Sequence, residues 1–206
     1  MTNPDSAFDV LALTSKLEST FEVGVLHEEL QLFAYLACLL SVYDGQPSAE
    51  WGYEFAATTS GSPYSGDLDE AVRARYELGF LNRQADQFYM TDRGAVELEL
   101  LAQLSRNRDR SPYLEAAASS VLIKPVGSVG RAISQDPQIR SAASLHHSRP
   151  LLGESATLVL YSHFQMLRNA LVDYGEDLLL PAVAWIEMFD ERVAGKPEQQ
   201  LEANNP

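Results

Sequence analysis

Positive charge, cysteine and long apolar segments are all scarce in this 206-residue sequence. The single cysteine, Cys38, cannot form an internal disulfide, and its apolar surroundings predict a small buried side chain. The longest apolar run, Leu32 to Leu40, is about half of the roughly 20 residues that a membrane-spanning helix needs. The first five residues carry one acidic and no basic side chain, unlike a secretion signal. These features predict a globular cytoplasmic protein without a membrane anchor.

The charge balance argues against general binding to nucleic acid. Fifteen Lys and Arg stand against 29 Asp and Glu, a net charge of −14, so the whole molecule should be repelled by nucleic acid and by anionic membranes. Residues 66–110 nevertheless hold seven of the basic side chains. This segment either contributes to a mixed, solvated surface or forms a small basic face on an acidic body. The seven are Arg73, Arg75, Arg83, Arg93, Arg106, Arg108 and Arg110.

The first half of the chain alternates helical and strand-like patterns. Residues 1–21 predict an N-terminal arm or short helix, and apolar spacings of three and four predict a helix from Leu26 to Tyr43. After a turn at 44–47, the aromatic residues Trp51, Tyr53 and Phe55 alternate with other residues, as in a short strand or an extended segment that packs aromatics on one side.

A helix, a hairpin and a second helix are predicted to follow. Ser65 or Asp67 can cap a helix that runs to about Leu78. The β-prone pieces 80–81 and 88–90 predict a hairpin, and the next helix begins at 91 or 92 and carries apolar residues to Leu104. The polar tract 105–110 resembles a boundary or an exposed linker.

The second half is predicted to be helical throughout. Ser111-Pro112 and Asp136-Pro137 each place a capping residue before a proline, the arrangement that begins a helix. Further helical patterns cover 126–134, 155–172 and 178–193, with Pro181 in a first turn. The sequence therefore predicts a mostly α protein: a winged helix at 22–108, which is a helix-turn-helix with a β-hairpin wing, then a helical part at 109–195 and a flexible tail at 196–206.

Four stretches carry a more specific signal: Tyr53-Glu54-Phe55, Gly61-Ser62-Pro63-Tyr64-Ser65, Leu78-Gly79-Phe80-Leu81 and Tyr89-Met90-Thr91-Asp92-Arg93-Gly94. In order and type they resemble a bacterial winged-helix family. That family has a Tyr-x-Phe strand, a Gly-Pro-Tyr-Ser turn, a Leu-Gly-Leu-Ile helix exit and a Tyr-x-Leu-Thr-x-x-Gly wing strand. The resemblance implies an accessory protein of a phage-associated, mobile-element or defence locus. The architecture also resembles winged-helix accessory subunits of SMC-type ATPases.

A winged helix that binds DNA would use the predicted helix 66–78 to read bases. Arg73 and Arg75 would then face the major groove, and Arg83 on the wing would face phosphate. The first turn of that helix, however, holds the acidic residues Asp67, Asp69 and Glu70, which oppose a phosphate backbone. These acidic residues favour a module that binds protein. A winged-helix fold is compatible with that function, because a fold alone does not fix a function.

Catalytic and metal-binding patterns are missing from the sequence. The four histidines, His27, His146, His147 and His163, lack the spacing of paired metal ligands, and no nucleophile or phosphate-binding motif occurs. A small hydrolase or nuclease would require His163 or His146 to converge with carboxylates in a pocket. The sequence therefore predicts no enzyme, no cofactor and no metal.

The preferred interpretation is a non-enzymatic adaptor or regulatory subunit that acts through protein contacts in a bacterial multi-component complex of a defence or mobile-element system, and a homodimer is compatible with it. The alternative is a dimeric DNA-binding transcriptional regulator, and nucleic acid could also be reached through a local basic face or a partner. The residues expected to contact a partner or DNA are Arg73, Arg75, Arg83, Arg106, Arg108, Arg110, Trp185 and Phe189.

Overall fold

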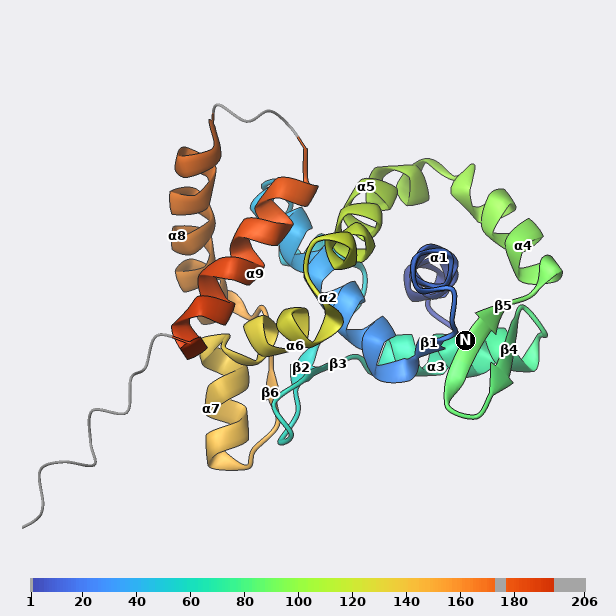
Figure 1. Cartoon of the computed structure of the whole chain (residues 1–206), viewed down its shortest axis with the longest axis horizontal. Coiled ribbons are helices and arrows are strands. Elements are labelled where there is room, and N and C mark those ends of the chain that lie inside the picture. The colour runs from blue at the N-terminus through green and yellow to red at the C-terminus, as the bar shows by residue number, and fades with distance from the viewer. Residues whose placement is uncertain (1, 173–176, 195–206) are drawn as a thin grey trace, which may run out of the picture.

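The first helix, α1 (Pro4–Phe21), lies at the centre of the N-terminal half. In this computed structural model, which describes residues 2–172 and 177–194, α1 is seen end-on in Figure 1 with α2 (His27–Tyr43), α4 (Asp92–Ala102) and α5 (Ser105–Ser119) around it. Asn3 begins the helix by accepting hydrogen bonds from the amides of Asp5 and Ser6, and Pro4 takes the first helical position.

The segment predicted as an N-terminal arm or short helix is thus a helix of 18 residues that packs within the N-terminal half. Residues 5–11 of α1 are all buried, and Asp5 and Asp9 are among them. A helix that is covered on nearly every side has no amphipathic stripe. The weak helical pattern of this segment therefore reflects complete burial.

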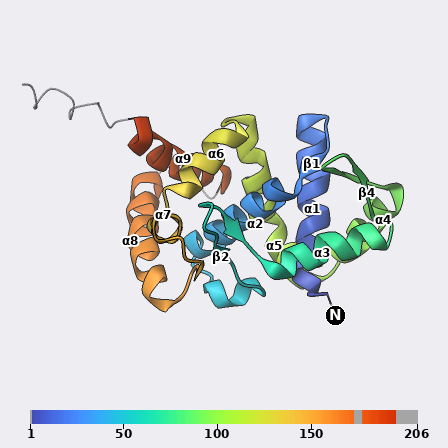
Figure 2. The same cartoon turned by 90° about the horizontal axis from the view of Figure 1, so that it is seen from below.

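Helix α2 joins the two halves of the molecule. It packs against α1 and α5 on one side and against α6 (Val126–Ser134), α8 (Glu154–Leu171) and α9 (Leu179–Ala194) on the other, and Figure 2 shows it running between the two groups. All residues from Leu30 to Val42 are buried, including Cys38, whose thiol pKa is raised by burial. The buried apolar side chains of both halves form one continuous cluster.

A three-stranded antiparallel sheet has the order β1-β5-β4 and comprises β1 (Val25–Leu26), β4 (Leu81–Gln84) and β5 (Gln87–Met90). The predicted hairpin is confirmed, with a two-residue turn at Ala85 and Asp86 between the pair Gln84 and Gln87. Strand β1 joins it through the pairs Val25 with Phe88 and Leu26 with Gln87.

The motif that leads from the hairpin into α4 has a steric origin. The hydroxyl of Thr91 accepts a hydrogen bond from the amide of Gly94 at 3.0 Å and so caps α4. A Cβ on Gly94 would collide with the carbonyl oxygen of Phe80, so only glycine fits against the segment that follows α3. Thr91 and Gly94 therefore have structural roles.

The turn before α3 (Gly66–Glu77) is held differently from the expectation. The buried side chain of Gln31 accepts a hydrogen bond from the amide of Ser65 at 2.8 Å and donates one to its carbonyl at 3.2 Å. The hydroxyl of Ser65 makes no capping bond, and the ring of Tyr64 is exposed. Gly61 has a φ of +84°, which suits glycine.

The aromatic segment forms a short 3-10 helix, η1 (Ser48–Trp51), then bends at residues 52–53, and residues 51–55 are not part of a β-strand. Its alternation is nevertheless real, because Trp51, Tyr53 and Phe55 are buried while Glu54 is exposed. Strand pairing begins only at β2 (Ala56–Ala57), which lies between β3 (Pro63–Tyr64) and β6 (Arg149–Pro150).

Helix α5 runs through the predicted linker and across the predicted boundary at 108/109. It begins at Ser105, six residues before the predicted start at Ser111, and carries Pro112 in its interior. Proline at that position has no N–H to donate to the preceding turn. Within this tract, Arg106 and Arg110 contact acidic side chains of α1, as described below.

The remaining helices follow the prediction. They are η2 (Ser120–Leu122), α6, α7 (Pro137–Leu145), α8 and α9, and Pro181 lies in the first turn of α9. Asp136 caps α7 by accepting hydrogen bonds from the amides of Gln138 and Ile139. The predicted tail at 196–206 lies outside the described residues. Among the residues described, no helix unites the length and the apolar character needed to cross a bilayer.

Candidate functional site

Two of the predicted contact arginines line one groove. Arg73 of α3 and Arg83 of β4 border a cavity of about 580 Å³ between α3, the hairpin and the start of α2. Its floor is apolar, because Val72 and Phe88 are nearly covered and Leu26 and Tyr76 are partly exposed. The remaining lining residues are His27, Glu28, Asp69 and Asp86. We refer to this cavity as the wing groove.

The wing groove carries more carboxylates than cations. Glu28, Asp69 and Asp86 face two arginines, so the lining has a formal charge of −1 when His27 is neutral. Two of these carboxylates are already paired: Asp69 lies 3.2 Å from Nε2 of His27, and Asp86 lies 3.3 Å from the guanidinium of Arg83. Within the described residues, Arg73 and Glu28 have no ion-pair or hydrogen-bond partner.

Arg75 does not line the wing groove. Its guanidinium lies 3.7 Å from Glu97 of α4 and 5.5 Å from the ring centroid of Phe80. Burial lowers the pKa of Arg75 from its usual value, although Glu97 opposes this change. Arg93 stacks on Phe80 as well, at 5.4 Å. Arg75 and Arg93 thus help to join α3 to α4.

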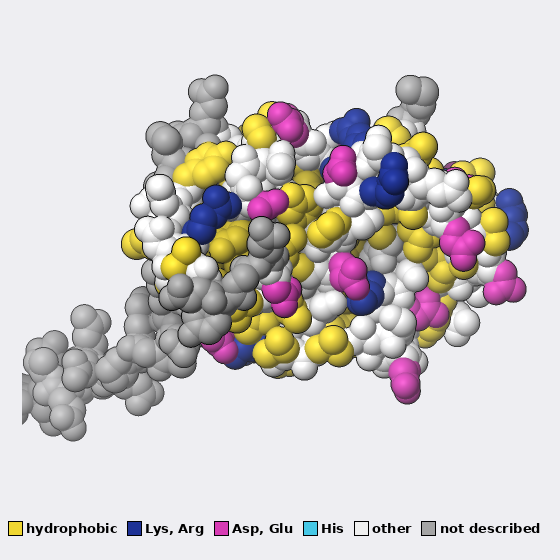
Figure 3. Space-filling view, turned by 90° about the horizontal axis from the view of Figure 1, so that it is seen from above, with side chains coloured by type: hydrophobic (Ala, Val, Ile, Leu, Met, Phe, Trp, Pro, Cys, Tyr) yellow, Lys and Arg dark blue, Asp and Glu magenta, His cyan; other side chains and the backbone are white. Residues whose placement is uncertain are grey.

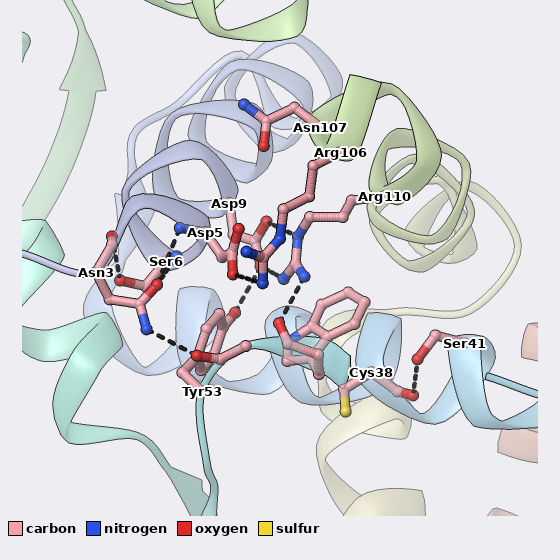
Figure 4. A network of polar contacts seen from close by, with 12 residues as sticks. Asn3, Asp5, Ser6, Asp9, Cys38, Ser41, Tyr53, Arg106, Asn107 and Arg110 are labelled. Atoms are coloured by element: carbon pink, nitrogen blue, oxygen red, sulfur yellow. Dashed lines mark hydrogen bonds and ion pairs between the residues drawn. The ribbon is translucent and has the colours of Figure 1, made fainter. Parts of the chain in front are cut away.

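Two arginines of the predicted linker, Arg106 and Arg110, form a polar network with α1, shown in Figure 4. Arg110 is only 5% exposed and holds Asp9, which is fully buried, through two nitrogens at 3.0 and 2.5 Å. The hydroxyl of Tyr53 donates to the same carboxylate at 2.6 Å, and Arg110 also donates to the carbonyl of Trp51 at 2.6 Å. Arg106, whose side chain is 59% exposed, pairs through one nitrogen with the buried carboxylate of Asp5.

The attraction between the charges and the burial of the pair shift the pKa values of Asp9 and Arg110 in opposite directions. Burial raises the pKa of the Asp9 carboxyl against the attraction of Arg110. Burial alone would lower the pKa of Arg110, but the attraction of Asp9 and its hydrogen bonds raise it above the usual value. The two-pronged contact and the bond from Tyr53 support an ionised pair, since both favour the charged carboxylate.

Sequence reasoning missed this network, yet a signal for it was present. Asp5 and Asp9 are four residues apart on α1, and Arg106 and Arg110 are four residues apart on α5. Matching spacings place both charges of each helix on one face, so two ion pairs can form at once. Arg106 and Arg110 therefore join α5 to α1, and the burial of Arg110 leaves it inaccessible to a partner.

Arg108, Trp185 and Phe189 differ in exposure. Arg108 is exposed on α5. Trp185 and Phe189 are each 2% exposed, with ring centroids 4.8 Å apart in the interior of the C-terminal half. The sequence-based expectation that they form a contact surface is corrected on this point, because α6 and α8 cover the face of α9 that carries them.

A second cavity, of about 490 Å³, lies beside the polar network and is lined by Trp51, Arg106, Arg110 and Tyr113, among others. The hydroxyl of Tyr113 donates to Asp44 at 2.7 Å. Burial, together with this hydrogen bond, raises the pKa of Tyr113 to about 12. The folded state therefore retains this proton where an unfolded chain, with a tyrosine pKa of about 10, loses it.

Stability should accordingly fall as the pH rises from about 10 to about 12, and Tyr113→Phe should reduce the slope of this fall. The contribution of Tyr113 is fully present below pH 10 because both states are then protonated. The test is urea unfolding of the wild type and of Tyr113→Phe between pH 9 and pH 12, with exposed Tyr161→Phe as the control. Equal slopes in all three proteins would contradict the prediction.

The histidines do not gather into a catalytic or metal-binding cluster. Among the described residues, no group of three or more His, Cys, Asp or Glu is arranged to hold a metal ion. His27 contacts Asp69, His146 occupies a left-handed position after α7, and His163 packs edge-on against Phe189. The enzyme alternative required His163 or His146 to converge with carboxylates in a pocket. His163 lies near one carboxylate, that of Asp136, which caps α7, and neither histidine lines the two cavities described above.

Comparisons with protein-family models, curated proteins and solved structures gave no match to this chain. The candidate site therefore depends on the geometry of the wing groove alone.

Proposed function

We propose that the chain is a winged-helix protein that binds another protein and does not catalyse a reaction. The order α1-β1-α2-α3-β4-β5, with β1 paired to the hairpin, supports a winged helix in which residues 44–65 are inserted between α2 and α3. In this arrangement α3 is the helix that a DNA-binding relative would place in the major groove.

The charge of the wing groove carries the proposal. Three carboxylates border the surface that phosphate would approach, and the first turn of α3 adds Asp67. Each of these groups opposes a polyanion, whereas a protein partner can pair with carboxylates and arginines alike. Figure 3 supports the same conclusion for another face, where Lys and Arg side chains lie among Asp and Glu side chains.

The biological setting we propose is a regulatory or accessory subunit of a bacterial multi-component complex. The sequence resemblance to winged-helix proteins of defence and mobile-element loci, and to accessory subunits of SMC-type ATPases, supports this setting. Such a subunit acts by docking, which requires a recognition surface and no reacting group.

The alternative, a DNA-binding regulator, has one observation in its favour. Arg73 and Arg83 come from different elements and still border the same groove, as a recognition helix and a wing would. The deciding feature is whether Arg73, which is exposed and unpaired among the described residues, contacts phosphate.

Binding to duplex DNA tests the two functions against each other. We expect no binding of the purified chain at low or near-physiological salt, for the wild type, Arg73→Glu and the control Arg108→Glu alike. Binding that weakens steeply with salt and disappears in Arg73→Glu, but not in Arg108→Glu, would overturn the proposal. Both arginines are exposed, so neither variant should disturb the core.

A further inference from the structure

We infer that the wing groove receives a segment of a partner protein in which an acidic and a basic side chain flank an apolar one. This inference rests on the proposed function and adds the chemistry of the partner. The evidence for it is that some charged side chains lining the wing groove have no ion-pair partner among the described residues.

Most charges around the wing groove already have a partner. Asp69 contacts His27 across the gap between α3 and α2, and Asp86 contacts Arg83 within the hairpin. Arg83 also donates to the carbonyl of Ala85 at 2.9 Å, which fixes it at the tip of the wing. Each of these four residues thus has at least one polar contact within the chain.

Two opposite charges remain available to a partner. Glu28 in the first turn of α2 and Arg73 in the middle of α3 are both exposed, and each lines the wing groove. Arg73 lies one helical turn after Asp69, and Glu28 follows His27, so both charges lie near the point where α3 and α2 meet through the His27–Asp69 contact. An acidic group on the partner would pair with Arg73, and a basic group would pair with Glu28.

The floor of the groove explains the apolar side chain between these charges. Val72 and Phe88 close the bottom, while Leu26 and Tyr76 are partly exposed at its sides. An apolar side chain would remove this surface from water, and charges on either side would fix its direction. A free phosphate would satisfy only Arg73 and would lie near three carboxylates, so a polypeptide fits the groove better.

The test is selection of a random dodecapeptide display library on the full chain. The expected result is enrichment of peptides in which an acidic and a basic residue flank an apolar one. The same selection is made on Glu28→Arg/Arg73→Glu, which exchanges the two charges, and on Glu99→Arg/Arg108→Glu, which exchanges exposed charges outside the groove. Protection of the buried Cys38 thiol from a thiol reagent verifies that each variant is folded.

Synthetic versions of the selected peptides then give the affinities. A peptide selected on the wild type should bind Glu28→Arg/Arg73→Glu about tenfold more weakly, because like charges across an interface repel. It should bind Glu99→Arg/Arg108→Glu with unchanged affinity. The same peptide with its acidic and basic residues interchanged should recover binding to the groove exchange. No enriched peptide, enrichment without this charge pattern, or equal affinity for both exchanges would overturn the inference.

Failure of this inference differs from failure of the proposed function. Peptides that bind equally well to both exchanged variants would use another surface, and a protein-binding function would stand. Salt-sensitive DNA binding that depends on Arg73 would instead remove the proposed function itself. The two experiments use the same purified chain, so their results can be compared directly.

Discussion

Replacement of Arg110 by alanine should lower the free energy of unfolding by about 3–5 kcal/mol, because it leaves a buried carboxylate without its counter-charge. Asp9 is fully buried and receives two of the hydrogen bonds of Arg110. The carbonyl of Trp51 loses its partner in the same variant, and the indole ring loses a guanidinium that lies 3.8 Å from its centroid.

Urea unfolding at neutral pH measures this loss, with Arg108→Ala as the matched control. Arg108 stands two residues earlier on α5 and is exposed, so its replacement should change the free energy of unfolding by no more than about 0.5 kcal/mol. Equal stability of Arg110→Ala and Arg108→Ala would mean that the buried pair does not hold α5 against α1.

A double replacement separates the pair from its surroundings. Asp9→Leu/Arg110→Met removes both charges at similar volume and should be more stable than Arg110→Ala alone, since a buried pair often gives little net stability over apolar residues. The recovery should be incomplete, because Tyr53 and the carbonyl of Trp51 keep polar groups without their partners.

Local signals in the sequence predict most of the secondary structure. The hairpin between β4 and β5, the proline-marked start of α7 and the position of Pro181 in α9 each depend on a few neighbouring residues. Such signals act through caps and backbone angles, which the sequence specifies directly. The aromatic alternation at 51–55 predicted a short strand or an extended segment with its aromatics on one side. The three aromatics are buried without forming a strand, because burial does not require strand pairing.

Long-range contacts account for the parts that were not predicted. Arg110 and Asp9 are 101 positions apart, so nothing near the polar tract indicates that it is a helix packed on α1. The central position of α1 in the N-terminal half could not be predicted either, because it also depends on contacts with residues far away in the sequence. Charge runs are usually solvated, and this one is an exception because its spacing matches that of two acids.

The candidate site was predicted in part. Arg73 and Arg83 were expected on one surface, and both border the wing groove. The acidic members Glu28 and Asp86 were not expected there, because the start of α2 and the hairpin turn meet α3 only in the folded chain. The mixture of charges is therefore a product of the fold, and it changes the kind of partner that the groove suits.

Replacement of Trp185 by alanine should lower the free energy of unfolding by about 3–5 kcal/mol, the range for loss of a large aromatic side chain from a core. Trp185 is 2% exposed and stacks against Phe189. Its indole nitrogen has no hydrogen-bond partner among the described residues, so the loss reports packing alone.

The same variant distinguishes a core residue from a contact residue. Leu122→Ala removes a side chain that is 68% exposed and should change stability by at most about 0.5 kcal/mol in urea unfolding. If Trp185 belonged to a docking surface, its replacement would behave like Leu122→Ala. Because α9 packs on α2, which also carries Cys38, the loss in Trp185→Ala should advance labelling of the Cys38 thiol to lower urea concentrations. Labelling of Cys38 at an unchanged urea concentration would show that the C-terminal helices unfold separately from the N-terminal half.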